Sequence, residues 1–284
     1  MLMAQTRYAR PDSLATAVAV LNGDPGARVL AGGQSLVNAL KLRASRVDLL
    51  VDVSRLSELR MLERASDGGL VLGAGITYAE VASSSDVQAA VPVLAQVADR
   101  LVDRQVRARG TVGGNCCFND PLSNLPPLFV ALEARMRIVG SSGSREVAAE
   151  EFFHGPYRTA VAQGELLESV VVPPLPSDVR VGYQSLQIAT DAWAMARAVV
   201  AISGDPIERA RVVVGCVGPR PLRRAAVERA LVGTRRSDVD AAALGTLASE
   251  DLVAVSDVHG SGAYRVKMTG VMTERAIREA IEGG

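Results

Sequence analysis

Two short stretches of the chain, "VLAGGQSL" (Val29–Leu36) and "GTVGGN" (Gly110–Asn115), each place a Gly-Gly pair at the end of a short β-type run. Glycine reaches positive φ without strain and has no Cβ, so an anion could approach the N–H groups of such a loop. Ser35 could cap a helix that follows the first pair, and the helix dipole would also favour an anion. After the second pair, the next helix is expected near Pro121. Two such loops meeting in space would bracket a diphosphate, whereas each one alone is most simply a tight turn.

Neither glycine pair belongs to a common nucleotide-binding signature. The stretch "GAGITY" (Gly73–Tyr78) contains G-x-G but lacks the third glycine of a dinucleotide fingerprint. No G-x-x-x-x-G-K-[ST] occurs in the chain. The sequence therefore argues against both a Rossmann domain and a P-loop domain.

Length and charge favour a globular protein of two packed domains. The chain has 284 residues, of which 48% are hydrophobic and 22% are charged. Lys+Arg and Asp+Glu balance at 31 each, so no net charge draws the chain to nucleic acid or to an anionic membrane. No stretch approaches the roughly 18 consecutive apolar residues of a membrane span. We expect neither a transmembrane segment nor a nucleic-acid partner.

Cysteine and histidine usage argues against a metal or iron–sulfur site held by this chain alone. Cys116, Cys117 and Cys216 form no C-x-x-C pair, and His154 and His259 lie far apart in the sequence. The ten N-terminal residues lack the apolar core of a signal peptide. An odd number of thiols without a secretion signal favours a reducing, cytoplasmic location.

The first part of the chain alternates short apolar runs with segments of helical periodicity. Strands are expected at 29–31, 48–53, 70–72 and 135–139. Helices are expected at 13–21, at 36–42, from Thr77 onward, at 88–100 with an interruption at Pro92, and at 125–132.

A proline cluster predicts a domain boundary in "VVPPLPSD" (Val171–Asp178), because three prolines in four positions cannot continue a helix or a central strand. Beyond it, strands are expected at 182–188 and 211–215, and helices at 194–202, 221–231 and 264–281. The second unit is therefore expected to be α+β, and the domains to span 1–175 and 176–284.

The flanks of both glycine pairs carry a resemblance. "AGGQSLVNALKLR" (Ala31–Arg43) resembles the first flavin-loop motif of the molybdopterin dehydrogenase FAD-binding family, and Asp103–Ala134 resembles the second, DPQVRNxGTIGGN…DPxxDLPxxLLAL. That family supplies the medium subunits of carbon monoxide dehydrogenase-like and xanthine dehydrogenase-like molybdenum hydroxylases. Further matches follow in the family's order at Gly73–Val81, Tyr157–Pro173 and Ser261–Ile277, so the resemblance covers nearly the whole chain.

The resemblance implies an α+β fold with two parts. A PCMH-type FAD-binding domain of two α/β subdomains would occupy 1–175, with a break near 55–60, and a C-terminal α+β lobe with an antiparallel sheet would follow. This chain would bind FAD and pass electrons from two [2Fe–2S] clusters on a small subunit to an external acceptor. A large subunit would carry a molybdopterin-type molybdenum cofactor and oxidise the substrate. Because the flavin would do the redox chemistry while the protein positions it, no Ser-His-Asp or paired-carboxylate constellation is expected in this chain.

The resemblance also implies which residues hold FAD. Backbone N–H groups of the two loops would bind the diphosphate, with Ser35 and Thr111 adding hydroxyl donors. Arg109 would support the second loop, and Asp120 would lie near the flavin. Lys41 is either an ordinary helix lysine or a further residue near the flavin. The loop residues implied are Ala31, Gly32, Gly33, Gln34, Ser35 and Leu36, and Thr111, Val112, Gly113, Gly114 and Asn115.

The sequence departs from the family pattern in three places. Asn124 stands where the family usually has an acidic residue that could bond the ribityl chain. Trp193 lies one position beyond the place where relatives often have an aromatic after an Asp, here Asp191; it either covers the isoalloxazine or packs in a core. Cys116 and Cys117 replace small residues, and free cysteine usually behaves as a buried hydrophobe rather than as a redox group.

Two alternatives to an electron-transfer subunit stay open: a self-contained flavin-dependent oxidoreductase, and a flavin-free structural subunit. A dimer of heterotrimers is the assembly that the resemblance implies. The substrate (carbon monoxide, a purine, an N-heterocycle or an aldehyde) and the electron acceptor are not determined by this sequence.

Overall fold

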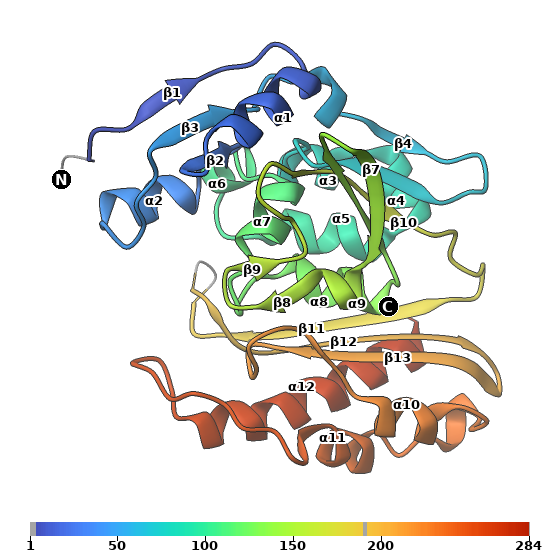
Figure 1. Ribbon diagram of the computed structural model, residues 1–284. Helices are drawn as coiled ribbons and strands as arrows, with labels where there is room; N and C mark the ends of the chain where they lie inside the picture. Colours follow the sequence, from blue (N-terminus) through green and yellow to red (C-terminus); the bar gives the residue numbers. More distant parts are fainter. Residues whose placement is uncertain (1–3, 190–191, 284) are drawn as a thin grey trace.

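The computed structural model describes residues 4–189 and 192–283, which form three main sheets with helices packed between and around them (Figure 1). The first sheet is parallel, with strand order β1-β3-β2, and lies at the upper left of Figure 1. Its strands are β1 (Arg7–Ala9), β2 (Ala27–Leu30) and β3 (Leu49–Asp52), connected by α1 (Leu14–Gly23) and α2 (Leu36–Lys41). Ser13 starts α1 by accepting a hydrogen bond from the N–H of Thr16.

The second sheet is antiparallel, with strand order β4-β5-β10-β6-β7. Its central strand β10 comes from far along the chain, so the sheet closes only when residues 166–172 return to pair with β5 and β6. Its strands are β4 (Leu62–Arg64), β5 (Leu70–Gly73), β6 (Arg135–Gly140), β7 (Gly143–Ala148) and β10 (Leu166–Val172).

Short helices and one small hairpin accompany this sheet. Pro92 is the first residue of α5. The helix expected at 88–100 is therefore interrupted at Pro92, as predicted, and divides into α4 and α5. The elements are η1 (Ser57–Leu59), α3 (Tyr78–Ser83), α4 (Ser85–Ala90), α5 (Pro92–Asp99), α6 (Arg104–Arg107), α7 (Val112–Phe118), α8 (Leu125–Ala131), α9 (Ala149–Phe152), and the hairpin of β8 (Phe153–Gly155) and β9 (Arg158–Thr159).

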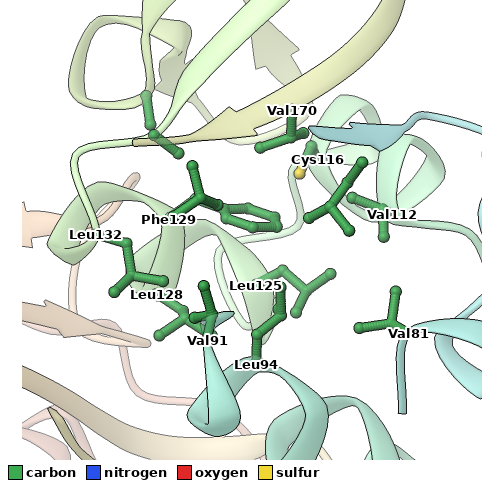
Figure 2. Packing of buried hydrophobic residues seen from close by; sticks show 14 of the residues in the cluster. Val81, Val91, Leu94, Val112, Cys116, Leu125, Leu128, Phe129, Leu132 and Val170 are labelled. Carbon is green, nitrogen blue, oxygen red and sulfur yellow. The ribbon is translucent and has the colours of Figure 1, made fainter. Parts of the chain in front are cut away.

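The largest core lies between these helices and the second sheet. Figure 2 shows Phe129 and Leu125 of α8 facing Val112 and Cys116 of α7, with Val170 of β10 above them. All five side chains are almost completely buried. Burying a side chain of this size contributes about 1.5–3 kcal/mol, so this cluster holds α7 and α8 firmly against the sheet.

The third sheet is antiparallel, in the order β11-β12-β13-β14. In Figure 1 it crosses the lower half of the molecule, with α8 on one face and α12 on the other. Its elements are β11 (Arg180–Gln187), β12 (Ala194–Gly204), β13 (Ile207–Gly215), β14 (Leu222–Arg223), α10 (Ala225–Leu231), η2 (Arg236–Asp238), α11 (Ala241–Ser249) and α12 (Gly262–Glu282). The antiparallel sheet and the mixed helices confirm the α+β expectation.

The helix expected at 194–202 is wrong, because this segment is the central strand β12. Its side chains alternate between two cores: Val199 belongs to the core that contains α8, and Val200 to the core that contains α12. A strand buried on both faces reads as a continuous apolar run without alternation, and such a run is easily mistaken for a helix.

Two further elements differ from the expectation. Residues 221–231 divide into strand β14 and helix α10, and α11 is an additional helix. Strands β7 and β10 were not predicted from the sequence. Within the described residues, no helix combines the length and the apolar character needed to cross a bilayer.

An ion pair between a buried arginine and an exposed aspartate holds the segment between α11 and α12. Arg265 is buried and donates to Asp257 Oδ2 at 2.6 Å and to the carbonyl oxygen of Met195 at 3.4 Å. The hydrogen bond from Arg265 lowers the pKa of Asp257 below its ordinary value, and a hydrogen bond from the N–H of His259 lowers it further. This pair therefore ties an otherwise exposed segment to the start of β12.

The Asp257→Asn variant is expected to be less thermostable than the natural chain at neutral pH. Because the folded-state pKa of Asp257 is depressed, its contribution is complete above the unfolded value of about 3.9 and is lost as the pH falls through the folded value. Thermal unfolding followed by circular dichroism between pH 7 and pH 3 measures this. Glu250→Gln, in the same segment, is the control, since that carboxylate forms no ion pair within the described residues. A difference that persists unchanged at pH 3 would contradict the electrostatic role.

Candidate functional site

The first glycine pair forms an irregular loop between β2 and α2. Gly33 has a φ of 74°, which glycine adopts without strain, and its carbonyl oxygen accepts from the N–H of Val37. Ser35 occupies the N-cap position of α2 as expected, but its side chain makes no cap hydrogen bond. The consecutive N–H groups of residues 32–36 donate to no acceptor within the described part of the chain. The loop therefore presents an uninterrupted row of backbone donors.

The second glycine pair lies in the first turn of α7, so the expectation of a helix only near Pro121 is wrong. Thr111 is the N-cap, and its hydroxyl oxygen accepts from the N–H of Gly114 at 3.0 Å. The N–H groups of Val112 and Gly113 donate to the carbonyls of Ile76 and Ala74, each at 2.9 Å, and that of Asn115 donates to Thr111 at 3.0 Å. Contrary to the expectation, the N–H groups of residues 112–115 thus already have acceptors inside the protein. The N–H of Thr111 has none within the described residues.

Two of the glycines let backbone segments approach each other closely. A Cβ on Gly32 would overlap the carbonyl oxygen of Arg109, so the first loop lies directly against the residue before the second. A Cβ on Gly113 would lie 2.5 Å from the Cβ of Ala74, at the end of β5. The two loops do meet in space, as the sequence suggests, and the missing side chains are what permits the contact.

A cavity of about 560 Å³ lies against both loops. The opposite wall comes from the β8–β9 hairpin and from the segment that leads into β10. Besides the loops, the lining consists of Leu21, residues 27–30, Val53, Leu59, residues 74–75, Tyr78, Gly110, Cys117, Phe118, His154, residues 157–159 and residues 161–167.

Ten of the predicted residues line this cavity. In the second loop, Val112 does not, because its side chain is completely buried in the core beside Cys116. Arg109 is outside the lining as well: its carbonyl abuts Gly32 and its side chain is exposed. The lining residues are Ala31, Gly32, Gly33, Gln34, Ser35, Leu36, Thr111, Gly113, Gly114 and Asn115.

Asn115 brings an unsatisfied acceptor to the cavity. Its Oδ1 atom is buried and has no hydrogen-bond partner among the described residues. The neighbouring Tyr78 also lines the cavity, and burial raises the pKa of its phenol well above the ordinary value. A buried polar atom without a partner is costly unless something else bonds it, so Asn115 points to a ligand with a donor group.

Asp120 and Asn124 lie beyond the far end of α7 and do not line the cavity. Asp120 Oδ2 accepts from the phenol of Tyr157 at 2.9 Å, and its Oδ1 accepts from the N–H of Leu122 at 2.9 Å. The Asn124 side-chain oxygen accepts from Arg197. Both side chains therefore hold protein segments in place.

Arg197 is a residue that the sequence did not single out. It is completely buried on β12, and it donates to the carbonyls of Leu122 at 3.0 Å and Ser123 at 2.6 Å as well as to Asn124. Its guanidinium also lies over the ring of Tyr183, with 5.9 Å to the centroid. No carboxylate pairs with it within the described residues. Arg197 thus joins the C-terminal sheet to the segment that connects α7 with α8.

Trp193 and Lys41 lie outside the cavity. Trp193 directly precedes β12 and is 52% exposed, which does not match the alternative of a core tryptophan. It does not line the cavity either. Lys41 is exposed in the last turn of α2. Asp191, the aspartate that precedes Trp193 in the family pattern, lies outside the described residues.

Of the vicinal cysteines, Cys116 is buried and Cys117 is half-buried. Burial raises the pKa of Cys116 well above its ordinary value and that of Cys117 to about 12. Cys116 belongs to the core in Figure 2, and Cys117 lines the cavity. Thiols with such raised pKa values are poor nucleophiles, in keeping with the reading of these residues as small hydrophobes.

The opposite wall of the cavity was not predicted. His154, Tyr157 and Arg158 reach it from the β8–β9 hairpin, and Glu165 from the segment before β10. Glu165 pairs with Arg145 at 2.8 Å, and the hydrogen bond from Arg145 lowers the pKa of its carboxyl group. The match of 157–173 to a family motif was the available signal, but nothing local in it indicates which side chains face a ligand.

Comparison with known proteins finds one family match in the N-terminal part of the chain and another in the C-terminal part. Residues 4–175 match the model of the FAD binding domain in molybdopterin dehydrogenase, and residues 182–280 match that of the CO dehydrogenase flavoprotein C-terminal domain. The chain is 35% identical to the glyceraldehyde dehydrogenase medium chain of Sulfolobus acidocaldarius over 274 residues, covering 96% of this chain and 97% of that one.

Solved structures with the same fold include a carbon monoxide dehydrogenase and a quinoline 2-oxidoreductase. The chain of the Hydrogenophaga pseudoflava carbon monoxide dehydrogenase, in a form that lacks the Mo-pyranopterin moiety of the molybdenum cofactor, superposes with a TM-score of 0.95 at 34% identity, covering 99% of this chain and 98% of that one. For quinoline 2-oxidoreductase from Pseudomonas putida 86, the TM-score is 0.93 at 32% identity, covering 99% of both chains. The similarity therefore extends over the whole fold and includes both cavity walls.

Proposed function

Since this chain belongs to the family of FAD-binding medium subunits of molybdenum hydroxylases, we propose that it passes electrons from [2Fe–2S] clusters of a partner subunit, through its own FAD, to an external acceptor. Membership of the family shows that the chain has an FAD-binding domain and is a medium subunit of a molybdenum hydroxylase. The route of the electrons and the assembly with a small and a large subunit, as a dimer of heterotrimers, are part of the proposal.

The proposal rests mainly on the backbone N–H groups of residues 32–36. These groups have no acceptor among the described residues, and they lie at a cavity of about 560 Å³. Consecutive N–H groups without protein acceptors form a concave, partly positive surface that suits a diphosphate. Ser35 adds an uncommitted hydroxyl, and Thr111 adds an N–H and a hydroxyl hydrogen from the second loop. On this basis we propose the first loop, rather than both loops equally, as the principal holder of the FAD diphosphate.

The remainder of the cavity also fits FAD. The orphaned Oδ1 of Asn115 can accept from a hydroxyl or N–H of the ligand, and the aromatic rings of Phe118, Tyr78 and Tyr157 line the same space. FAD supplies the redox chemistry when bound, because it can accept and release electrons that the protein side chains cannot carry. The task of this chain is therefore to bind, orient and shield the cofactor.

Carboxylates near the cavity are committed to structural partners. Glu165 is paired with Arg145, and Asp120 accepts from Tyr157 and Leu122. This arrangement supports oxidation of the substrate on another subunit over a self-contained oxidoreductase. The names of the relatives include glyceraldehyde, carbon monoxide and quinoline enzymes, so membership of the family does not select a substrate.

We further propose that the domains span 1–175 and 176–284, with a subdomain break near 55–60. In the proposed complex, the large partner subunit carries a molybdopterin-type cofactor, and the complex is located in the cytoplasm.

Purification of the intact complex from its host tests the assembly. This chain is expected to copurify with a large molybdenum-containing chain and a small iron–sulfur chain, and the purified complex is expected to oxidise a small organic substrate or carbon monoxide. The isolated chain is expected to show no turnover with the same substrate. Turnover by the isolated chain would instead support the self-contained oxidoreductase.

A further inference from the structure

Tyr157 is held in an unfavourable backbone conformation at the wall of the cavity. It lies at the turn of the β8–β9 hairpin with a φ of 57°, the left-handed region, which bulky side chains avoid. Such conformations persist only where the surroundings over-determine them, and they concentrate at ligand sites.

The surroundings of Tyr157 do over-determine its position. Its N–H donates to the carbonyl of Asn119 at 3.0 Å, and the buried side chain of Asn119 donates to the carbonyls of Gly155 at 2.7 Å and Arg158 at 2.9 Å. The Tyr157 phenol donates to Asp120 at 2.9 Å. The hairpin turn is thus fixed at four points to the C-terminal end of α7, the helix whose first turn contains the second glycine pair.

This fixation does not serve to bury the ring. Tyr157 is 60% exposed, and one contact of its ring is an edge-to-face arrangement with Phe118 at 5.1 Å between centroids. Both rings line the cavity together with Tyr78. A strained, rigidly held and largely exposed aromatic side chain in a cavity wall is a surface for a flat ligand, because aromatic rings gain stacking energy from such contacts.

We propose that Tyr157 is a further FAD-positioning residue, whose ring packs against one of the two ring systems of FAD. This inference rests on the proposed function. It also replaces Trp193, which lies outside the cavity, as the aromatic residue that contacts the cofactor. The Asn119 and Asp120 contacts then act through Tyr157, by presenting its ring at a fixed angle to the cavity.

The test uses the full-length chain freed of flavin and titrated with FAD by calorimetry. Tyr157→Asn removes the ring but keeps a residue that tolerates positive φ, so it is expected to leave the melting temperature of the flavin-free chain unchanged or raised. It is expected to weaken FAD binding about tenfold, through the lost stacking. Tyr157→Phe keeps the ring and loses the bond to Asp120, and it is expected to bind within about twofold of the natural chain. Tyr264→Asn, an exposed tyrosine on α12, is the matched control.

The outcomes separate the two proposals. Natural chain that binds no FAD would refute the proposed function. Natural chain and Tyr157→Asn that bind FAD with equal affinity would refute the role of Tyr157 alone. A purely structural role would lower the melting temperature in Tyr157→Asn, whereas the stacking role lowers affinity without lowering stability.

Titrations with ADP and with FMN then identify the ring. Weaker binding of ADP alone to Tyr157→Asn assigns the contact to the adenine, and weaker binding of FMN alone assigns it to the isoalloxazine. If Tyr157→Asn binds both fragments as the natural chain does, no ring of FAD contacts Tyr157 and the inference fails.

Discussion

Gly32→Ala is expected to abolish FAD retention by the purified chain. A methyl group at this position would overlap the carbonyl oxygen of Arg109, which belongs to the backbone before the second loop. Neither side of this contact is a flexible side chain, so the loops must move apart. The row of N–H groups at residues 32–36 is held in place by that contact, and it would lose its alignment with the cavity.

The expected fall in FAD affinity is about 100-fold or more, which corresponds to roughly 2.7 kcal/mol. Forcing an extra methyl group into a packed backbone contact costs about 1–3 kcal/mol of folding stability in addition. Flavin content by absorbance and FAD affinity by titration measure the first effect, and thermal unfolding measures the second.

Gly23→Ala is the matched control for this substitution. Gly23 ends α1, and a Cβ there would meet no atom within 4 Å. It is expected to retain FAD and stability close to those of the natural chain. Normal FAD content in Gly32→Ala would contradict the assignment of the loop junction to cofactor binding.

Arg197→Met is expected to destabilise the chain by about 3–5 kcal/mol, because several buried acceptors lose their donor and each such loss costs about 1–3 kcal/mol. The substitution leaves the carbonyl oxygens of Leu122 and Ser123 and the side chain of Asn124 without their donor. For a chain of this length, such a loss corresponds to a fall of about 10 °C in melting temperature. Thermal and urea unfolding of the purified chain measure it.

Asn124→Asp tests the electrostatic part of the contact between Arg197 and residue 124, because the variant keeps the acceptor oxygen and adds a negative charge. The variant supplies a carboxylate to a buried guanidinium that has no carboxylate partner within the described residues. It is expected to raise the melting temperature at pH 7, and the gain should disappear as the pH falls through the depressed pKa of the new carboxyl group. Equal stability of Arg197→Met and the natural chain would show that Arg197 does not hold the segment between α7 and α8 against the C-terminal sheet.

The two glycine pairs show which features of the candidate site could be predicted from the sequence and which could not. Their flanks predicted that both loops belong to one cofactor site, and the loops do line one cavity. Their individual roles depend on tertiary contacts: Gly33 alone of the four has positive φ, while Gly32 and Gly113 permit close backbone packing. A Gly-Gly pair looks the same in sequence whether it binds an anion or makes room for another segment.

The missed parts of the site come from long-range packing. Arg197 lies in a strand that reads as a helix, because both faces of β12 are buried and the apolar run shows no alternation. Tyr157 faces the cavity only because Asn119, far away in the sequence, holds the hairpin turn. Neither contact leaves a local pattern, so only the folded arrangement reveals them.

The two walls of the cavity have different roles in the proposed FAD site. Residues 32–36 supply the backbone donors for a diphosphate, and the β8–β9 hairpin supplies an aromatic surface. The buried Arg197 joins this domain to the C-terminal sheet through the segment after α7. The cavity and the contact with the C-terminal sheet therefore lie at opposite ends of α7.

The flavin content of the full-length chain, expressed and purified without partners, tests whether this chain binds FAD by itself. The purified protein is expected to be yellow and to release an equimolar amount of FAD on denaturation. A folded chain that is colourless and takes up no added FAD would contradict this expectation.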